Sequence, residues 1–242
     1  MTKMAQGKSG RGRLAIPHME DRFDIDGEQV TVRSEGSGGP VVYLQVFEGD
    51  GEEVWRACRE LGCPDFTLAS IGNLAWDDDL SPWECPPLTR DDAPCGGKAP
   101  AQLERLTDKI MPAVEDLLPQ PAAYSALAGY SLAGLFALWA AYRTNRFSRI
   151  ASASGSLWFP GFLDFARKNR FACAPDCVYL SLGSKEHKTP NRMLRSVKQN
   201  TLAFADLLQE RGIPHVFETN PGNHFVDTEI RMAKGISWML SH

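Results

Sequence analysis

The stretch that decides the fold is residues 124–144, YSALAGYSLAGLFALWAAYRT. It opens with a short apolar run of the kind that forms a buried strand, and it closes with a longer apolar run that is typical of a buried helix. Between the two lies a Gly-x-Ser-x-Ala turn, Gly129-Tyr130-Ser131-Leu132-Ala133. Because strand, turn and helix follow one another without a break, we predict a nucleophile elbow that lifts the hydroxyl of Ser131 clear of the sheet.

The geometry of such an elbow restricts the residues around the serine. The turn is so tight that Ser131 must adopt strained backbone angles, and the positions two residues before and after it must be small. Gly129 meets this requirement, and Ala133 replaces the more usual glycine at the cost of one methyl group. The turn also puts Ser131 at a helix N-terminus, whose free N–H groups favour developing negative charge. The alternative is a tight strand-to-helix turn without chemistry.

A serine hydroxyl is a poor nucleophile near neutral pH and needs an adjacent base. The turn-rich segment Asn220-Pro221-Gly222-Asn223-His224-Phe225 lies between the last predicted strand and the last predicted helix. A histidine there can reach over the sheet edge that carries Ser131, and its pKa suits proton transfer. We therefore predict His224 as the general base; the alternative is an ordinary surface histidine.

The third group should be a carboxylate that orients the histidine, placed between the two in chain order and at the end of a strand. The predicted strand 177–182 runs into Gly183-Ser184-Lys185-Glu186, so Glu186 is the candidate acid. Asp227 is the rival, although we interpret it as the N-cap of the last helix. Glu186 as a solvated loop residue is the other alternative.

Stabilising the oxyanion of an acyl-transfer reaction requires two backbone N–H groups. The first should belong to Leu132, directly after the nucleophile. The second should come from the loop after the apolar run 41–47, where Phe47 is our candidate and Glu48 the alternative.

Strand and helix patterns alternate along the rest of the chain. Residues 23–33 indicate an antiparallel hairpin with an Asp26-Gly27 turn, and later strands alternate with helices, which predicts an α/β fold with a mostly parallel sheet covered on both faces. Pro112 should kink or break the helix predicted within 101–118. Only about 25 residues separate Ile150 from Cys177, which excludes a large cap domain. We divide the chain into a flexible N-terminal tail, residues 1–20, and one domain, residues 21–242.

The composition excludes several classes of protein. A net charge of −4 argues against a nucleic-acid partner, and there is neither a membrane-spanning apolar run nor an export signal, so we expect a cytoplasmic protein. None of the six cysteines forms a Cys-x-x-Cys pair, and the three aspartates from Asp77 lack the spacing of a calcium loop, so no metal is expected. Local disulfides, Cys85–Cys95 or Cys173–Cys177, could form only if the protein were exported to an oxidising compartment.

The segment 73–97 follows a strand and should lean over the site. Its Trp76, Asp79 and Trp83 are candidate substrate-binding residues, because aromatic rings beside carboxylates can hold a polar or cationic group. Trp158, after another strand, is a candidate for an apolar acyl pocket. The alternatives are a packed surface loop for the first three residues and a core position for Trp158.

The order of elbow, Gly-x-x-Glu strand end and Gly-Asn-His-Phe loop resembles the "putative esterase" group of α/β-hydrolases, which includes enterochelin esterases, esterase D-like enzymes and mycolyltransferases. The resemblance runs from about Val41 to Leu240, and the stretch 76–83 looks like that of uncharacterised bacterial members. It implies an α/β-hydrolase fold with the catalytic serine and histidine at Ser131 and His224. The acid of this group is less regular, and some siderophore esterases manage with a Ser-His dyad.

The resemblance implies hydrolysis of a carboxylic ester or thioester without a metal or organic cofactor. We therefore expect a serine esterase that acts on a small-molecule ester, with its oligomeric state left open. An acyltransferase with the same residues, a siderophore-type lactone esterase and a non-catalytic binding protein of the same fold are the alternatives.

Overall fold

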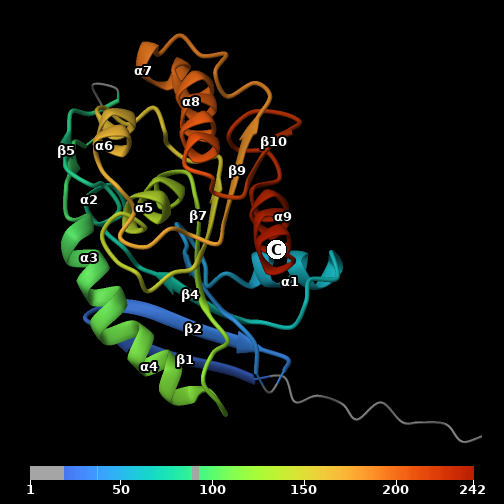
Figure 1. The fold of residues 1–242 in the computed structure, drawn as a ribbon. Coiled ribbons are helices and arrows are strands. Elements are labelled where there is room, and N and C mark those ends of the chain that lie inside the picture. Colours follow the sequence, from blue (N-terminus) through green and yellow to red (C-terminus); the bar gives the residue numbers. More distant parts are fainter. Residues whose placement is uncertain (1–18, 37, 89–92) are drawn as a thin grey trace, which may run out of the picture.

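A mostly parallel sheet forms the centre of the molecule in the computed structural model, which describes residues 19–36, 38–88 and 93–242 (Figure 1). Its described strands are, in sheet order, β1 (Met19–Ile25), β2 (Glu28–Ser34), β4 (Thr67–Gly72), β3 (Val41–Gln45), β7 (Ser125–Tyr130), β8 (Arg149–Ala153), β9 (Cys177–Gly183) and β10 (His215–Asn220). Neighbouring strands from β4 to β10 run parallel, whereas β2 is antiparallel to both β1 and β4. The predicted α/β architecture is confirmed.

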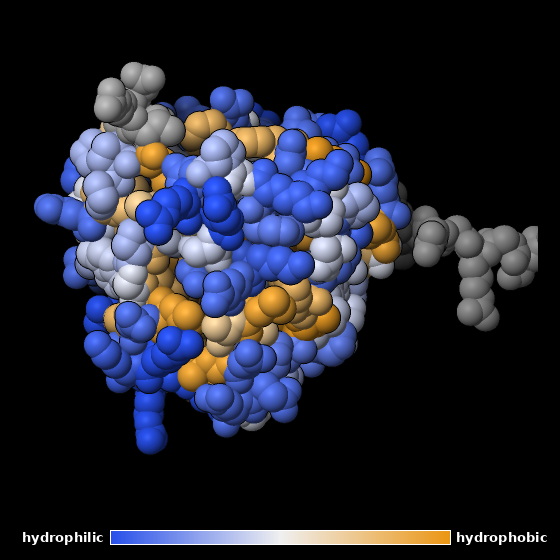
Figure 2. All heavy atoms as spheres, turned by 90° about the horizontal axis from the view of Figure 1, so that it is seen from above, coloured by the Kyte–Doolittle hydropathy of each residue, from blue (hydrophilic) through white to orange (hydrophobic). Residues whose placement is uncertain are grey.

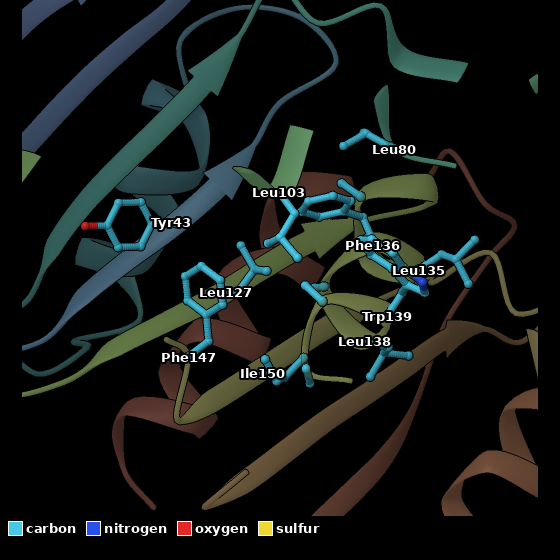
Figure 3. Close-up of a cluster of buried hydrophobic side chains, with 14 of the residues drawn as sticks. Tyr43, Leu80, Leu103, Leu127, Leu135, Phe136, Leu138, Trp139, Phe147 and Ile150 are labelled. Carbon is cyan, nitrogen blue, oxygen red and sulfur yellow. The ribbon is translucent and has the colours of Figure 1, made fainter. Parts of the chain in front are cut away.

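Helices cover both faces of this sheet, as expected for a parallel sheet whose strands are buried on both sides. One face packs against α3 (Ala99–Arg105), α4 (Met111–Leu117), α5 (Leu132–Ala140), α6 (Phe162–Lys168) and α8 (Val197–Glu210). The other face packs against α1 (Glu52–Glu60) and α9 (Thr228–Leu240), which also contact each other. The larger core lies on the α5 side, where Leu135, Phe136 and Trp139 meet side chains from the sheet (Figure 3). The face of the molecule seen in Figure 2 is largely hydrophilic, with hydrophobic residues gathered in small patches.

The N-terminal hairpin forms where the sequence predicts it. Asp26 and Gly27 join β1 to β2 with positive φ angles of 53° and 89°, as a type I′ hairpin turn requires. Met19 and Glu20 already pair with Ser34 and Arg33, so the ladder includes the last two residues of the tail expected at 1–20. Residues 1–18 lie outside the described part of the chain.

Pro112 does not break its helix. α3 passes into a π-helical segment, Leu106–Ile110, and then into α4, which contains Pro112 near its start. Proline lacks the N–H that an α-helix uses and its ring clashes with the carbonyl four residues earlier. A wider π turn is one way to relieve that clash, because its hydrogen bonds reach one residue further along the chain.

The segment after β4 is more structured than the loop expected at 73–97. It contains the short helix α2 (Trp76–Asp79) and a two-stranded ladder of β5 (Glu84–Cys85) and β6 (Cys95–Gly96). Cys85 and Cys95 are register partners in this ladder, and both are free thiols. Such two-residue strands are too short to show an alternating pattern in the sequence.

Between β8 and β9 the chain forms only α6, in agreement with the short connection that the sequence allows. The single turn α7 (Arg192–Arg195) precedes α8, and the side chain of Asn191 caps it by accepting hydrogen bonds from two backbone N–H groups. None of the described helices combines the length and the apolarity needed to cross a bilayer.

The turn from β7 to α5 has the strained geometry predicted for the elbow. Ser131 has φ 58° and ψ −121°, which is a costly conformation for a residue with a side chain. The turn also brings the backbone of α5 close to β7. A Cβ atom on Gly129 would lie 2.2 Å from the carbonyl carbon of Ala133 and 2.3 Å from its oxygen, so this position accepts only glycine without a shift of the backbone.

We predict that Gly129→Ala lowers the free energy of unfolding by about 3 kcal/mol, because overpacking against fixed backbone cannot be relieved by a rotamer change. The measurement is chemical denaturation followed by circular dichroism. Gly36→Ala is the control, since a Cβ there would meet nothing closer than 3.5 Å, and it should change stability by less than about 0.5 kcal/mol. Equal stability of the Gly129→Ala variant and the wild type would refute this account of the turn.

Candidate active site

The elbow places the Ser131 hydroxyl at the carboxyl end of β7, in hydrogen-bond contact with an imidazole. Oγ of Ser131 lies 2.9 Å from Nε2 of His224 and 3.4 Å from Oγ of Ser156. The strained turn is held by backbone hydrogen bonds, since the N–H of Ser131 donates to the carbonyl of Ala153 and its own carbonyl accepts from the N–H of Ser156. The serine is therefore fixed by the neighbouring strand β8 and the segment that follows it.

His224 lies in the loop between β10 and α9, as the sequence predicts. The hydroxyl of Tyr130 donates a 2.6 Å hydrogen bond to the backbone carbonyl of His224, and the ring of Tyr130 lies 5.4 Å from the imidazole. Phe225 also contacts the imidazole, in an edge-to-face arrangement at 5.2 Å. These contacts from the residue before the serine and the residue after the histidine restrict the position of the imidazole ring.

Glu186 is the carboxylate that contacts His224. It lies in the turn after β9, and its Oε2 is 2.9 Å from Nδ1 of the histidine. Its other oxygen, Oε1, accepts hydrogen bonds from the hydroxyl of Ser154 at 2.7 Å and from the N–H of Gly183. The side chain of Glu186 is 5% exposed, so its charge is balanced by these partners and not by solvent.

The surroundings of Glu186 favour its ionised form. Burial by itself would raise the pKa of this carboxyl, but the hydrogen bond and the charge of His224, together with the hydrogen bonds from Gly183 and Ser154, hold the pKa below its ordinary value. The rival Asp227 stands at the N-cap position of α9 with a positive φ of 52°, but its side chain makes no capping hydrogen bond. Asp227 thus has the predicted N-cap position, but the prediction that its side chain caps the helix is wrong. The carboxylate that pairs with His224 is that of Glu186.

A buried arginine that the sequence analysis missed connects the parts of the site. Arg231 of α9 is 1% exposed, and its Nη1 lies 3.4 Å from Oε1 of Glu186 and 3.2 Å from the Tyr130 hydroxyl. Its Nη2 donates to the carbonyl of Pro221 at 2.6 Å. A guanidinium in this position links Glu186 to the loop that carries His224. The sequence signal for a buried arginine was its spacing. Arg231 lies four positions before Gly235, and both residues are on the buried face of α9.

The two expected oxyanion donors lie at the same edge of the sheet. Leu132 opens α5, where the first N–H groups of a helix have no partner within it, and Phe47 follows the end of β3. Among the described residues, neither N–H donates a backbone hydrogen bond outside the regular helices and strands. Phe47 and the alternative Glu48 both line the cavity that contains Ser131.

That cavity has a volume of about 690 Å³ and contains Ser131 and His224 in its wall. The rest of the wall comes from the end of β3 and the loop after it, the start of α1, the first two turns of α9, and the residues Trp76, Tyr130 and Phe225. The cavity therefore lies on the α1 and α9 side of the sheet, directly beside the hydroxyl and the imidazole.

Of the four expected substrate-binding residues, the structure brings only Trp76 into this cavity, where it packs edge-on against Phe47 at 5.2 Å. Three do not line it. Asp79 instead accepts a hydrogen bond from the N–H of Ala75 and so stabilises the start of α2. Trp83 donates its indole N–H to the carbonyl of Pro160, and Trp158 packs against the core. Each of these three side chains thus bonds to or packs against another part of the chain.

The arrangement is chemically suited to acyl transfer. A hydroxyl bonded to an imidazole, which is in turn bonded to a carboxylate, is the array that activates serine nucleophiles on unrelated folds. Within the described ranges, no group of three or more His, Cys, Asp or Glu side chains is arranged to hold a metal ion.

Comparisons with known proteins agree with this fold. Residues 74–227 match the family model described as "Putative esterase". The uncharacterized protein YbbA of Bacillus subtilis (strain 168) is 26% identical over 188 residues, which are 74% of this chain and 75% of that protein.

Two solved structures share the α/β-hydrolase fold with this chain. The siderophore hydrolase EstA from Aspergillus nidulans superposes with a TM-score of 0.70 at 19% identity, over 100% of this chain and 99% of that one. An IroE-like serine hydrolase from Shewanella oneidensis superposes with a TM-score of 0.75 at 20% identity, over 93% and 80% of the two chains.

We predict that Glu186→Gln lowers stability near pH 7 by about 1–3 kcal/mol, because charged hydrogen bonds to a buried carboxylate are lost. Since the folded-state pKa of Glu186 lies below the unfolded value of about 4.3, its contribution is complete above that value and disappears as the pH falls through the folded pKa. The difference between wild type and variant should therefore shrink between about pH 5 and pH 3.

Thermal melts across this pH range measure the effect, with Glu60→Gln, an exposed carboxylate on α1, as the control. A difference between wild type and Glu186→Gln that stays constant down to pH 3 would show that the charge of Glu186 does not stabilise the fold.

Proposed function

The chain belongs to the esterase family, and from this premise we propose that it hydrolyses carboxylic esters through a covalent acyl-enzyme on Ser131. The single observation that carries the proposal is the continuous chain from the Ser131 hydroxyl through His224 to Glu186, with both links 2.9 Å long. The three side chains come from different loops and converge only in the folded protein.

In the first half of the reaction, Oγ of Ser131 attacks the carbonyl carbon of the ester while Nε2 of His224 takes the hydroxyl proton. Glu186, bonded to Nδ1, keeps Nε2 free to accept that proton and stabilises the imidazolium that results. The oxyanion forms beside the N–H groups of Leu132 and Phe47, to which we assign its stabilisation. The imidazolium then gives its proton to the departing alcohol, and the acyl group stays on Ser131.

In the second half, water replaces the alcohol. His224 removes a proton from the water, which attacks the acyl-enzyme, and the second tetrahedral intermediate collapses to the free acid and the regenerated serine. Arg231 takes no part in bond making. Its contacts with Glu186, Tyr130 and Pro221 give it a positioning role.

We predict that Ser131→Ala lowers kcat/KM for p-nitrophenyl esters of short acids by about 10⁴-fold or more, because the covalent route is lost. His224→Ala should come close to this loss, and Glu186→Gln should lose less. Release of p-nitrophenol, followed by absorbance, is the measurement.

Ser156→Ala is the matched control, since it removes a hydroxyl 3.4 Å from that of Ser131, whereas the described hydrogen bonds of the His224 ring go to Ser131 and Glu186. It should keep more than about a tenth of the wild-type activity, because loss of a general acid or base lowers the rate by about 100-fold or more. Full turnover by Ser131→Ala would show that the proposed mechanism is wrong. Product analysis with added alcohol separates hydrolysis, for which we expect free acid, from acyl transfer, which would give a new ester.

A further inference from the structure

The chemical character of the cavity beside Ser131 narrows the substrate class, on the premise of the function proposed above. We infer that the preferred ester carries a cationic group, of the ammonium type, that lies in this cavity. Three observations support the inference: carboxylates without cationic partners, aromatic rings in the same wall, and a buried amide without a partner.

Three carboxylates line the cavity, from Glu48, Glu53 and Glu229. None of them forms an ion pair with a described lysine, arginine or histidine, and Glu229 accepts only the hydroxyl of Thr228. Among the described residues of the cavity wall, none is lysine or arginine. The wall therefore presents negative charge that its own lining residues do not neutralise. Arg22 lines the adjoining cavity together with Glu48 and Glu53, but its ion pairs are with Glu20 and Asp50.

Aromatic rings share the wall with these carboxylates. Phe47 and Trp76 meet edge to face, and the rings of Tyr130 and Phe225 each contact the imidazole of His224. Phe47 is 68% and Phe225 84% exposed, so both present open ring surface beside the cavity. The electron-rich face of an aromatic ring attracts cations, and rings combined with carboxylates are the usual means of binding an ammonium group.

Gln45 gives an independent sign that the wall receives a ligand. It ends β3, lines the cavity and is 1% exposed, yet neither its side-chain oxygen nor its nitrogen has a hydrogen-bond partner among the described residues. A buried amide without a partner costs free energy, and a polar group of a bound substrate would lower that cost.

Two of the carboxylates also stabilise their helices, and the experiment must separate this effect from the attraction of a cationic substrate. Glu53 and Glu229 lie in the first turns of α1 and α9, where negative charge stabilises a helix dipole. Glu52 lies in the same first turn of α1 but does not line the cavity. Glu52→Gln is therefore a matched control that removes the same charge from the same helix end.

The test compares cationic esters with neutral esters of the same shape. In the first pair the charge is in the acid: p-nitrophenyl 4-(trimethylammonio)butanoate against p-nitrophenyl 5,5-dimethylhexanoate. In the second pair it is in the leaving group: butanoylthiocholine against the 3,3-dimethylbutyl thioester of butanoic acid. Each kcat/KM is corrected for the spontaneous hydrolysis rate of its ester.

We expect the cationic member of at least one pair to be hydrolysed about tenfold faster than its neutral partner in kcat/KM. This ratio should fall about three- to tenfold in Glu53→Gln and in Glu229→Gln, and stay unchanged in Glu52→Gln.

Neutral members that are hydrolysed as fast as the cationic ones in both pairs, with turnover that depends on Ser131, would overturn the inference and leave the proposed function intact. An equal fall of the ratio in Glu52→Gln would also overturn it. If none of the four esters is hydrolysed faster by the wild type than by Ser131→Ala, both the inference and the proposed function fail.

Discussion

The structure depends on one steric constraint, the close approach of β7 and α5 at the elbow. Glycine at position 129 has no side chain, and this allows the chain to turn sharply from β7 into α5. Ser131 takes up the strain of the turn with a positive φ. The strain is held by hydrogen bonds to the adjacent strand and by the tightly packed helix α5, all of whose residues are buried. A rigid core thus supports a hydroxyl that stands clear of it.

A second layer of organisation is electrostatic. Glu186 is buried, and its charge is acceptable there because it receives hydrogen bonds from His224, Ser154 and Gly183 and faces the guanidinium of Arg231. Gly183 must be small at this point, since a Cβ on it would lie 2.9 Å from Nη1 of Arg231. The same network anchors the loop of His224, so the position of the His224 ring and the charge of Glu186 are coupled.

The sequence predicts the main elements of this arrangement well, because apolar periodicity and turn residues mark strands and helices locally. It also predicts the three residues of the hydrogen-bonded chain, since each one follows a recognisable strand end. It does not predict what depends on side chains meeting across the fold. Trp83 looked like a site residue but is held by Pro160, and Arg231 gave only a weak signal. Two of the three carboxylates of the cavity, Glu53 and Glu229, lie in the first turns of helices, where acidic residues are common for local reasons.

The central claim is that Ser131 becomes covalently bonded to the acyl group of the substrate during turnover. Labelling with a fluorophosphonate, followed by peptide mass spectrometry, tests it most directly, because the reagent bonds only to a serine that a neighbouring base activates. We predict one phosphonylated peptide, with the modification on Ser131, and loss of labelling in His224→Ala. Modification of another serine, or undiminished labelling of Ser131→Ala, would contradict the account.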